Sequence, residues 1–261
     1  MKKILIGIVT CCLFTISFSG NVFALDGTGE DPGYTPNDPP GTKIPDDFTI
    51  DTTYRVEPRP SNLPSTFTEH HLLRGNLVDS RWTSDGLSYY KQHDYPYIGY
   101  GGTNCSDDIA SSGCALTALA SVVSRYGKNY DPPALNNYLG ASAFSGCLLN
   151  WITAASRLSL SYQKDDFSPN YYESTAKLKM QERIQKGYSP IVSLKCSSGH
   201  QAYCEAPTHY VINYGYETYW NDDGTGYTTY HYLHNPGGAN KNEINQYMDH
   251  YYIVSLHNYG Y

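Results

Sequence analysis

One cysteine stands where a helix is expected to begin. Cys114 precedes a run of small and apolar residues that ends at Gly127. Leucine, alanine and valine side chains recur three and four residues apart in this run, which predicts a helix with one buried face. Ser111 or Ser112 can cap its start, and Gly127 fits the left-handed backbone that often ends a helix.

The first turn of a helix favours negative charge, because its backbone N–H groups have no partner within the helix. A thiol at that position is expected to have a lowered pKa and to be a good nucleophile. Two plainer interpretations compete with this one. Cys114 is then either a small apolar residue that covers the helix end or one half of a disulfide.

The cysteine count bears on this choice. The chain has seven cysteines, and Cys11 and Cys12 lie in an apolar run that begins after Lys2 and Lys3 and ends near Ala24. A basic start, a short apolar core and a small final residue predict a secretory signal peptide over residues 1–24, too short to span a membrane. We therefore expect a secreted protein, extracellular or periplasmic, with no membrane anchor.

Removal of the signal peptide leaves five cysteines, an odd number (7 − 2 = 5). Exported proteins generally pair their cysteines, so one is left over. Cys196 and Cys204 flank a short polar loop and are expected to pair, which leaves Cys105 and Cys147 for a second bridge and Cys114 free. Spacing alone does not fix the connectivity, and a bridge from Cys105 to Cys114 would remove the nucleophile.

The domain organisation follows from composition. The segment from about residue 26 to 65 is rich in Pro, Gly and Asp and buries too little apolar surface to fold alone, so residues 25–83 are interpreted as a linker or a short pro-segment. Residues 84–261 are long enough for one domain. Without the signal peptide the charge is about −9 (16 basic against 25 acidic residues), which argues against nucleic acid as a partner. We expect a monomer.

Helical and strand patterns follow one another in a clear order. Helices are predicted after Cys114, from Asp131 to Gly140, and over residues 148–158 and 174–186. Strands are predicted over residues 87–90, 191–194, 209–216, 227–234 and 251–256, with a hairpin turn at residues 221–224. Helices followed by an antiparallel sheet make an α+β fold.

A thiol nucleophile needs a base, and His209 is the best candidate among nine histidines because a strand is predicted to begin there. Alternation places His209, Val211 and Asn213 on one face, within reach of a helix packed across the sheet. The plain alternative is a histidine at a strand end that is bonded to solvent or backbone. His231 and His234 are rivals for the base or for the group that orients it.

Two amide side chains complete the candidate site. Asn235 follows a predicted strand and can hold an imidazole nitrogen, although Asn-Pro-Gly-Gly is also a strong turn signal. Gln92 precedes Cys114 by 22 residues, and its amide can donate to an oxyanion that forms beside the backbone N–H of Cys114. Either residue alone would carry little weight.

Together these residues form an ordered set that resembles a known family. In chain order the motifs are Lys91-Gln92 with Asp94, Ser112-Gly113-Cys114-Ala115-Leu116, Tyr126-Gly127, Trp151, Gly187 with Pro190, His209-Tyr210-Val211-Ile212 and Asn235-Pro236. The set resembles the papain-like cysteine peptidases, in particular those similar to bacteriocin-processing (double-glycine leader) peptidases and their secreted bacterial relatives. The resemblance covers about residues 88–256.

The resemblance implies a papain-like fold, with N-terminal helices packed on an antiparallel sheet, and hydrolysis of peptide bonds through an acyl-enzyme. By motif, Cys114 is the nucleophile, His209 the base, Asn235 the orienting group and Gln92 the oxyanion donor, with no cofactor and no metal. The sequence departs from the family in three places. The loop between Gln92 and Cys114 is longer than in compact papain-like enzymes and holds Cys105. Ala115 and Leu116 stand where Gly-Pro is frequent, and Asn235 stands where aspartate is usual.

Two alternatives use the same residues. A cell-wall amidase or endopeptidase would apply the same thiol and imidazole to peptidoglycan stem peptides. A non-catalytic binding module would keep the scaffold with an unreactive thiol. A metal site is disfavoured, because the cysteines and histidines lack close ligand pairs such as Cys-x-x-Cys.

Overall fold

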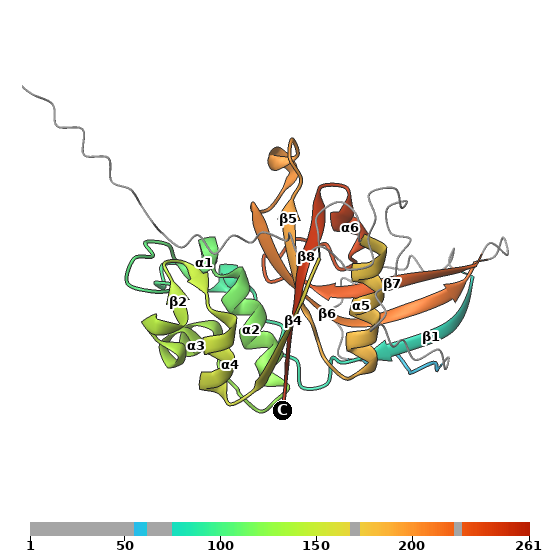
Figure 1. Cartoon of the computed structure of the whole chain (residues 1–261), viewed down its shortest axis with the longest axis horizontal. Helices are drawn as coiled ribbons and strands as arrows, with labels where there is room; N and C mark the ends of the chain where they lie inside the picture. Colours follow the sequence, from blue (N-terminus) through green and yellow to red (C-terminus); the bar gives the residue numbers. More distant parts are fainter. Residues whose placement is uncertain (1–54, 62–74, 168–172, 222–225) are drawn as a thin grey trace, which may run out of the picture.

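The computed structural model describes residues 55–61, 75–167, 173–221 and 226–261 (Figure 1). The predicted signal peptide and most of the Pro- and Gly-rich segment lie outside these residues, as does most of the predicted hairpin turn at 221–224. Within the described ranges, no helix combines the length and the apolar character needed to cross a bilayer.

The fold is α+β, as the sequence predicted, and its centre is a six-stranded sheet whose strands differ in length and pair antiparallel. The strand order is β1-β6-β5-β8-β4, and β7 pairs with β6. The strands are β1 (Asn76–Trp82), β4 (Ser161–Asp166), β5 (Ile191–Cys196), β6 (Thr208–Trp220), β7 (Tyr227–His234) and β8 (Tyr251–Gly260).

Strand β6 is long enough to pair with three other strands. Residues 208–212 pair with β5 and residues 215–220 pair with β1, while β7 pairs with residues 212–220. Figure 1 shows the β1, β6 and β7 ends extending together away from the helices. One half of β6 therefore belongs to the central sheet, and the other half belongs to this three-stranded extension.

The helices fall into two groups. In Figure 1, α1 to α4 lie together at one side, and α5 lies across the sheet. The helices are α1 (Ile109–Ser112), α2 (Cys114–Ser124), α3 (Pro132–Leu139), α4 (Trp151–Leu158), α5 (Glu173–Gln185) and α6 (Asn245–Met248), with short 3₁₀ turns η2 (Gln92–Asp94), η3 (Ala141–Ala143) and η4 (Gln201–Tyr203) and a small ladder of β2 (Phe144–Ser145) and β3 (Leu148–Leu149).

The alternation of strand residues creates two hydrophobic cores. Ile191 and Ile212 join the core that contains the apolar side chains of α2. Their neighbours Val192 and Val211 join the other core, which contains apolar side chains of α5 and α6. Successive strand side chains point to opposite faces of a sheet, so α2 and α5 cover opposite faces.

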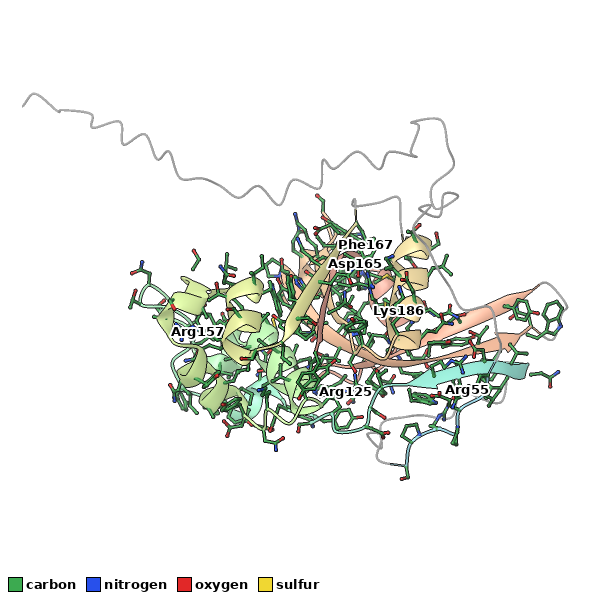
Figure 2. The ribbon with its side chains drawn as sticks, turned by 60° about the horizontal axis from the view of Figure 1, so that its bottom comes forward. Arg55, Arg125, Arg157, Asp165, Phe167 and Lys186 are labelled. Atoms are coloured by element: carbon green, nitrogen blue, oxygen red, sulfur yellow. A yellow bond between two sulfur atoms is a disulfide. The ribbon has the colours of Figure 1, made fainter. Side chains whose placement is uncertain are left out.

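Hydrogen bonds from Arg125 join the end of α2 to the loop before β5. The Arg125 guanidinium donates to the Gly187 carbonyl (3.1 Å) and to the Ser189 hydroxyl (2.9 Å). Figure 2 shows Arg125 between the helical side and the sheet. This contact helps to fix the α2 axis relative to the strands.

Several helix ends agree with the sequence. The backbone of Gly127 has φ 70°, just after α2. The Asp131 side chain caps α3 by accepting from the Ala134 N–H, and Gly140 ends that helix with φ 61°. The expected serine cap of α2 is wrong, because Gly113 precedes α2 with no side-chain cap. Ser111 belongs to α1.

The structure also corrects the element boundaries. Residues 87–90 form no strand, and β1 begins at Asn76, so the folded unit starts before the expected boundary at residue 84. Strand β4 was not predicted, because its residues are almost all polar and show no alternation of apolar and polar side chains. The predicted helix at 148–158 begins at Trp151, because Leu148 and Leu149 pair with β2.

Candidate active site

Among the five cysteines that the structure describes, one thiol is free. Cys105 is bonded to Cys147 and Cys196 to Cys204, as the sequence predicted, and Cys114 is the free cysteine. Cys114 is the first residue of α2, and 9% of its surface is exposed.

Backbone N–H groups lie close to the sulfur of Cys114. Backbone hydrogen bonds from Tyr210 and Ala115 favour the thiolate, but burial outweighs them and raises the pKa of the Cys114 thiol to about 11. The lowered pKa expected from the helix terminus alone is therefore wrong. A thiolate at neutral pH needs a further partner, such as a protonated imidazole.

His209 lies at the start of β6, and its ring is held by Asn235. The His209 Nε2 and Asn235 Oδ1 atoms are 2.7 Å apart. The same Oδ1 accepts from the Gly237 N–H (2.8 Å), while the Asn235 Nδ2 donates to Glu205 (3.2 Å). These partners fix which end of the amide faces the ring, so Nε2 is the protonated nitrogen of neutral His209 and Nδ1 carries the lone pair.

The remaining nitrogen of His209 is available for proton transfer. Nδ1 makes no hydrogen bond to any of the described residues. Burial lowers the pKa of His209, which keeps the ring neutral near pH 7, although Glu205 and Asn235 act in the opposite direction. A neutral imidazole with a free lone pair is the state that a general base requires.

The helices that cover the face of His209 are α5 and α6 and not α2, which carries Cys114. His209 pairs with Leu194 across the ladder and shares a face with Val211, and both of these belong to the core covered by α5 and α6. The approach to Cys114 occurs instead at the end of the sheet, where the N–H of Tyr210, the next residue, faces the sulfur. No hydrogen bond joins the Cys114 and His209 side chains among the described residues, and such bonds are often long in a site without substrate.

Gln92 lies in η2 and bonds both to the turn after Asn235 and to the helix before Cys114. Its N–H donates to the carbonyl of Pro236 (2.9 Å), the residue after Asn235. Its side-chain amide donates to the carbonyl of Ala110 (2.8 Å) in α1, just upstream of Cys114. The amide has a second N–H, which this bond leaves over for another acceptor.

Glu205 is a member of the site that the sequence analysis missed. Its carboxylate lies 3.4 Å from His209 Nε2, accepts from Asn235 and lies 3.9 Å from the Lys241 ammonium. The sequence held one indication of this position: Glu205 directly follows Cys204, whose bridge to Cys196 fixes the backbone just before His209. A carboxylate here holds the Asn235 amide and favours the protonated form of the ring.

Neither rival histidine is bonded to Asn235. His234 Nε2 lies 2.7 Å from the Tyr90 carbonyl, and His231 is buried in β7 with no partner for Nδ1 among the described residues. Burial lowers the pKa of His234 to about 4 and that of His231 to about 3. Of these three histidines, His209 is the one that Asn235 holds.

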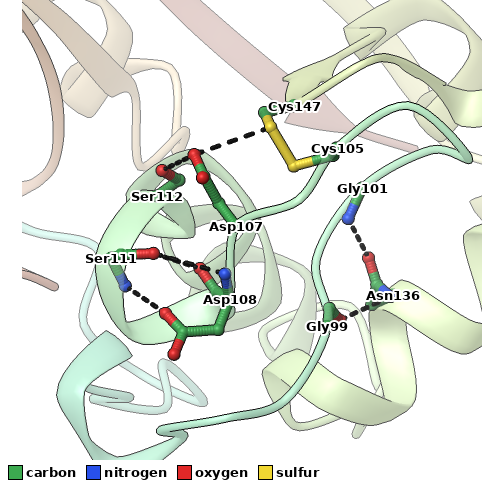
Figure 3. Close-up of a disulfide and its surroundings, with 9 residues drawn as sticks. All are labelled: Gly99, Gly101, Cys105, Asp107, Asp108, Ser111, Ser112, Asn136 and Cys147. Atoms are coloured by element: carbon green, nitrogen blue, oxygen red, sulfur yellow. Dashed lines mark hydrogen bonds between the residues drawn. A yellow bond between two sulfur atoms is a disulfide. The ribbon is translucent and has the colours of Figure 1, made fainter.

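A disulfide supports the loop that leads to α1. Figure 3 shows Asp107 between the Cys105–Cys147 bridge and Ser112, whose hydroxyl donates to the Asp107 carboxylate (2.6 Å). Asn136 of α3 accepts from the Gly101 N–H (3.1 Å) on the same loop. Cys105, Asp107 and Cys147 have metal-ligand spacing, but their two sulfurs are bonded to each other and so supply no thiolates.

The site therefore combines a free thiol at the start of α2, an oriented imidazole at the start of β6 and an amide from η2. The expected residues Gln92, Asn235 and His209 are connected through the turn at Pro236, and Cys114 meets them at the Tyr210 backbone. No protein family model matches the sequence, and no curated protein matches it.

Proposed function

We propose that the protein is an exported cysteine peptidase of the papain-like type. The observation that carries this proposal is the 2.7 Å contact between His209 Nε2 and Asn235 Oδ1, which leaves His209 Nδ1 as the ring nitrogen that can accept a proton from the free thiol of Cys114. Helices packed on an antiparallel sheet, with the thiol at a helix start and the imidazole at a strand start, are in keeping with that fold.

In the proposed reaction His209 Nδ1 takes the proton of Cys114, and the thiolate attacks the carbonyl carbon of a peptide bond. The imidazolium, stabilised by Asn235 and Glu205, offsets the burial that raises the thiol pKa. The oxyanion accepts from the backbone N–H of Cys114 and from the second side-chain N–H of Gln92. The imidazolium then protonates the departing amine.

Water completes the cycle. His209, neutral again, takes a proton from a water molecule that attacks the acyl-enzyme. The C–S bond then breaks as the acid product forms, and the imidazolium returns its proton to the departing Cys114 sulfur. Base catalysis accounts for about 10²–10⁴-fold of the acceleration, and an oxyanion donor for a further factor of about 10²–10³. Asn235 keeps the ring in the tautomer that both half-reactions need.

The first test is the alkylation of native protein by iodoacetamide near pH 6, with the labelled cysteine mapped. We compare wild type with His209→Ala, and we use His200→Ala as a control, since His200 lies in the loop between Cys196 and Cys204. The proposal expects fast labelling of Cys114 that is lost in His209→Ala and kept in His200→Ala. Equal labelling of Cys114 in wild type and His209→Ala would refute the dyad.

The substrate class is tested separately. Hydrolysis of casein, abolished by Cys114→Ala, supports a general peptidase. Release of soluble fragments from purified cell walls, without casein cleavage, assigns the same thiol chemistry to peptidoglycan stem peptides. An unreactive Cys114 with neither activity would favour a binding module.

A further inference from the structure

The segment 55–61 lies against the edge strand β1. The Ser80 N–H donates to the Arg55 carbonyl (2.9 Å), the Glu57 N–H donates to the Ser80 carbonyl (3.2 Å), and Val56 forms a parallel bridge with Ser80. Figure 2 shows Arg55 beside β1. The segment thus extends the sheet by a few residues, although its composition suggested a linker.

The Arg59 side chain of this segment reaches Glu217 of β6. Arg59 Nη2 lies 2.7 Å from both oxygens of Glu217, and its Nε lies 3.2 Å from Oε1. The guanidinium carbon is 5.9 Å from the ring centre of Trp82 and 5.7 Å from that of Tyr232. A two-point bond to a carboxylate combined with aromatic faces suits arginine and not lysine.

The receptor for this guanidinium is built from strand residues. Trp82 ends β1, Glu217 and Tyr219 lie on β6, and Tyr232 lies on β7. Glu217 is 3% exposed, and the hydroxyls of Tyr219 and Tyr232 donate to its Oε2 at 2.7 and 2.6 Å. Trp82 and Tyr232 also stack, with ring centres 5.3 Å apart. The sheet therefore holds the receptor in place, while the arginine comes from outside it.

The charge balance at Glu217 explains why the arginine matters. Burial acts to raise the pKa of Glu217, but hydrogen bonds from Tyr232, Arg59 and Tyr219 outweigh it and hold the pKa below its usual value. The carboxylate is thus ionised in a buried position. Loss of the guanidinium would remove a two-point ion pair from this buried carboxylate, which is unfavourable.

We propose that Trp82, Glu217, Tyr219 and Tyr232 form a guanidinium-binding site that holds Arg59 in the intact chain and accepts the arginine side chain of a separate peptide when Arg59 is absent. The site fastens the segment 55–61 to β1. It lies on the β1, β6 and β7 extension, at the other end of β6 from His209. The proposal is independent of the chemistry of Cys114.

The test uses the full chain with Arg59→Ala and N-acetylargininamide as the probe. We expect saturable binding by calorimetry and a rise in the melting temperature of Arg59→Ala, with neither effect in wild type, whose site is filled. N-acetyllysinamide is expected to bind at least tenfold more weakly, because it lacks the planar fork. The double variant Arg59→Ala/Glu217→Gln is expected not to bind the arginine probe.

Three outcomes would overturn the proposal: no saturable binding by folded Arg59→Ala, equal binding of the lysine probe, or equal binding by wild type. If Arg59→Ala does not fold alone, its refolding yield is measured with each probe, and the proposal requires rescue by the arginine probe only. Arg59→Lys serves as a second variant. Its melting temperature must rise more with the arginine probe than with the lysine probe, and equal rises would count against the site.

Discussion

Substitution of Gly237 tests how closely the candidate site is packed. A Cβ atom added at Gly237 would lie 2.8 Å from Glu205 Oε2, 3.0 Å from His209 Cε1 and 3.1 Å from Asn235 Oδ1. Ordinary contact begins at 3.4 Å, so the three groups must together absorb up to 0.6 Å (3.4 − 2.8). Gly237 is not among the glycines with positive φ, so the expected effect comes from this crowding and not from backbone strain.

The magnitude follows from these displacements. A misplacement of about 1 Å in a catalytic site can cost about 10²-fold, so a shift of about half that size is expected to slow catalysis about tenfold. Overpacking of this kind also lowers the free energy of unfolding by about 1–3 kcal/mol. Gly237→Ala should therefore stay folded with an impaired His209.

The assay is the rate constant for alkylation of Cys114 near pH 6, together with the rate of peptide hydrolysis once a substrate is known. Gly99→Ala is the matched control, because a Cβ there meets nothing within 4 Å. We expect both rates to fall about tenfold in Gly237→Ala and to be unchanged in Gly99→Ala. Wild-type rates in a folded Gly237→Ala protein would refute the view that Glu205, His209 and Asn235 act as one tightly packed group.

Four further predictions follow from the same contacts. Asn235→Ala should lower hydrolysis about 10- to 100-fold, while Asn235→Asp, which can still accept from Nε2, retains more activity. Gln92→Ala should lower kcat about 10²–10³-fold without loss of Cys114 alkylation, since the amide serves the oxyanion and not the thiol. In His209→Ala the alkylation rate should rise about tenfold per pH unit toward pH 11, the pKa set by burial, and a flat profile would contradict this. In denaturant unfolding, the free energy of unfolding should fall as the pH drops below 6.5, by up to about 4 kcal/mol per pH unit. Burial holds the pKa of His231 and His257 at about 3 and that of His234 at about 4, so the unfolded chain binds more protons than the native one.

The features that the sequence predicted well are those set by local rules. The cysteine pairing agrees with the expectation that one of the five cysteines outside the predicted signal peptide stays unpaired, and the ends of α3 followed from Asp131 and Gly140, whose side chain and backbone act on their own neighbours. The α+β class followed from the order of the helical and strand patterns. The structure also brings Asn235 to His209, as the order of residues suggested.

The features that the sequence missed depend on distant partners. Strand β1 pairs with β6, and the Arg59 side chain bonds to Glu217 of β6; both partners lie more than a hundred residues later, which no local pattern shows. Alternation placed His209 and Val211 on one face but did not indicate which helices cover it, and these are α5 and α6. The thiol pKa was mispredicted for a similar reason, since burial arises from the whole fold and outweighs the local helix terminus.

The position of the free thiol also affects how the protein acquires its disulfides. Cys105 and Cys114 are 9 residues apart (114 − 105), whereas Cys105 and Cys147 are separated by 42. Chain closure alone therefore favours the wrong bridge by about tenfold in the unfolded chain. Formation of α2 buries Cys114 and removes this competitor, so correct oxidation depends on folding preceding bond formation. Refolding in the presence of oxidant should accordingly give a higher native yield for Cys114→Ser than for wild type, and disulfide exchange should be the slow step of wild-type folding.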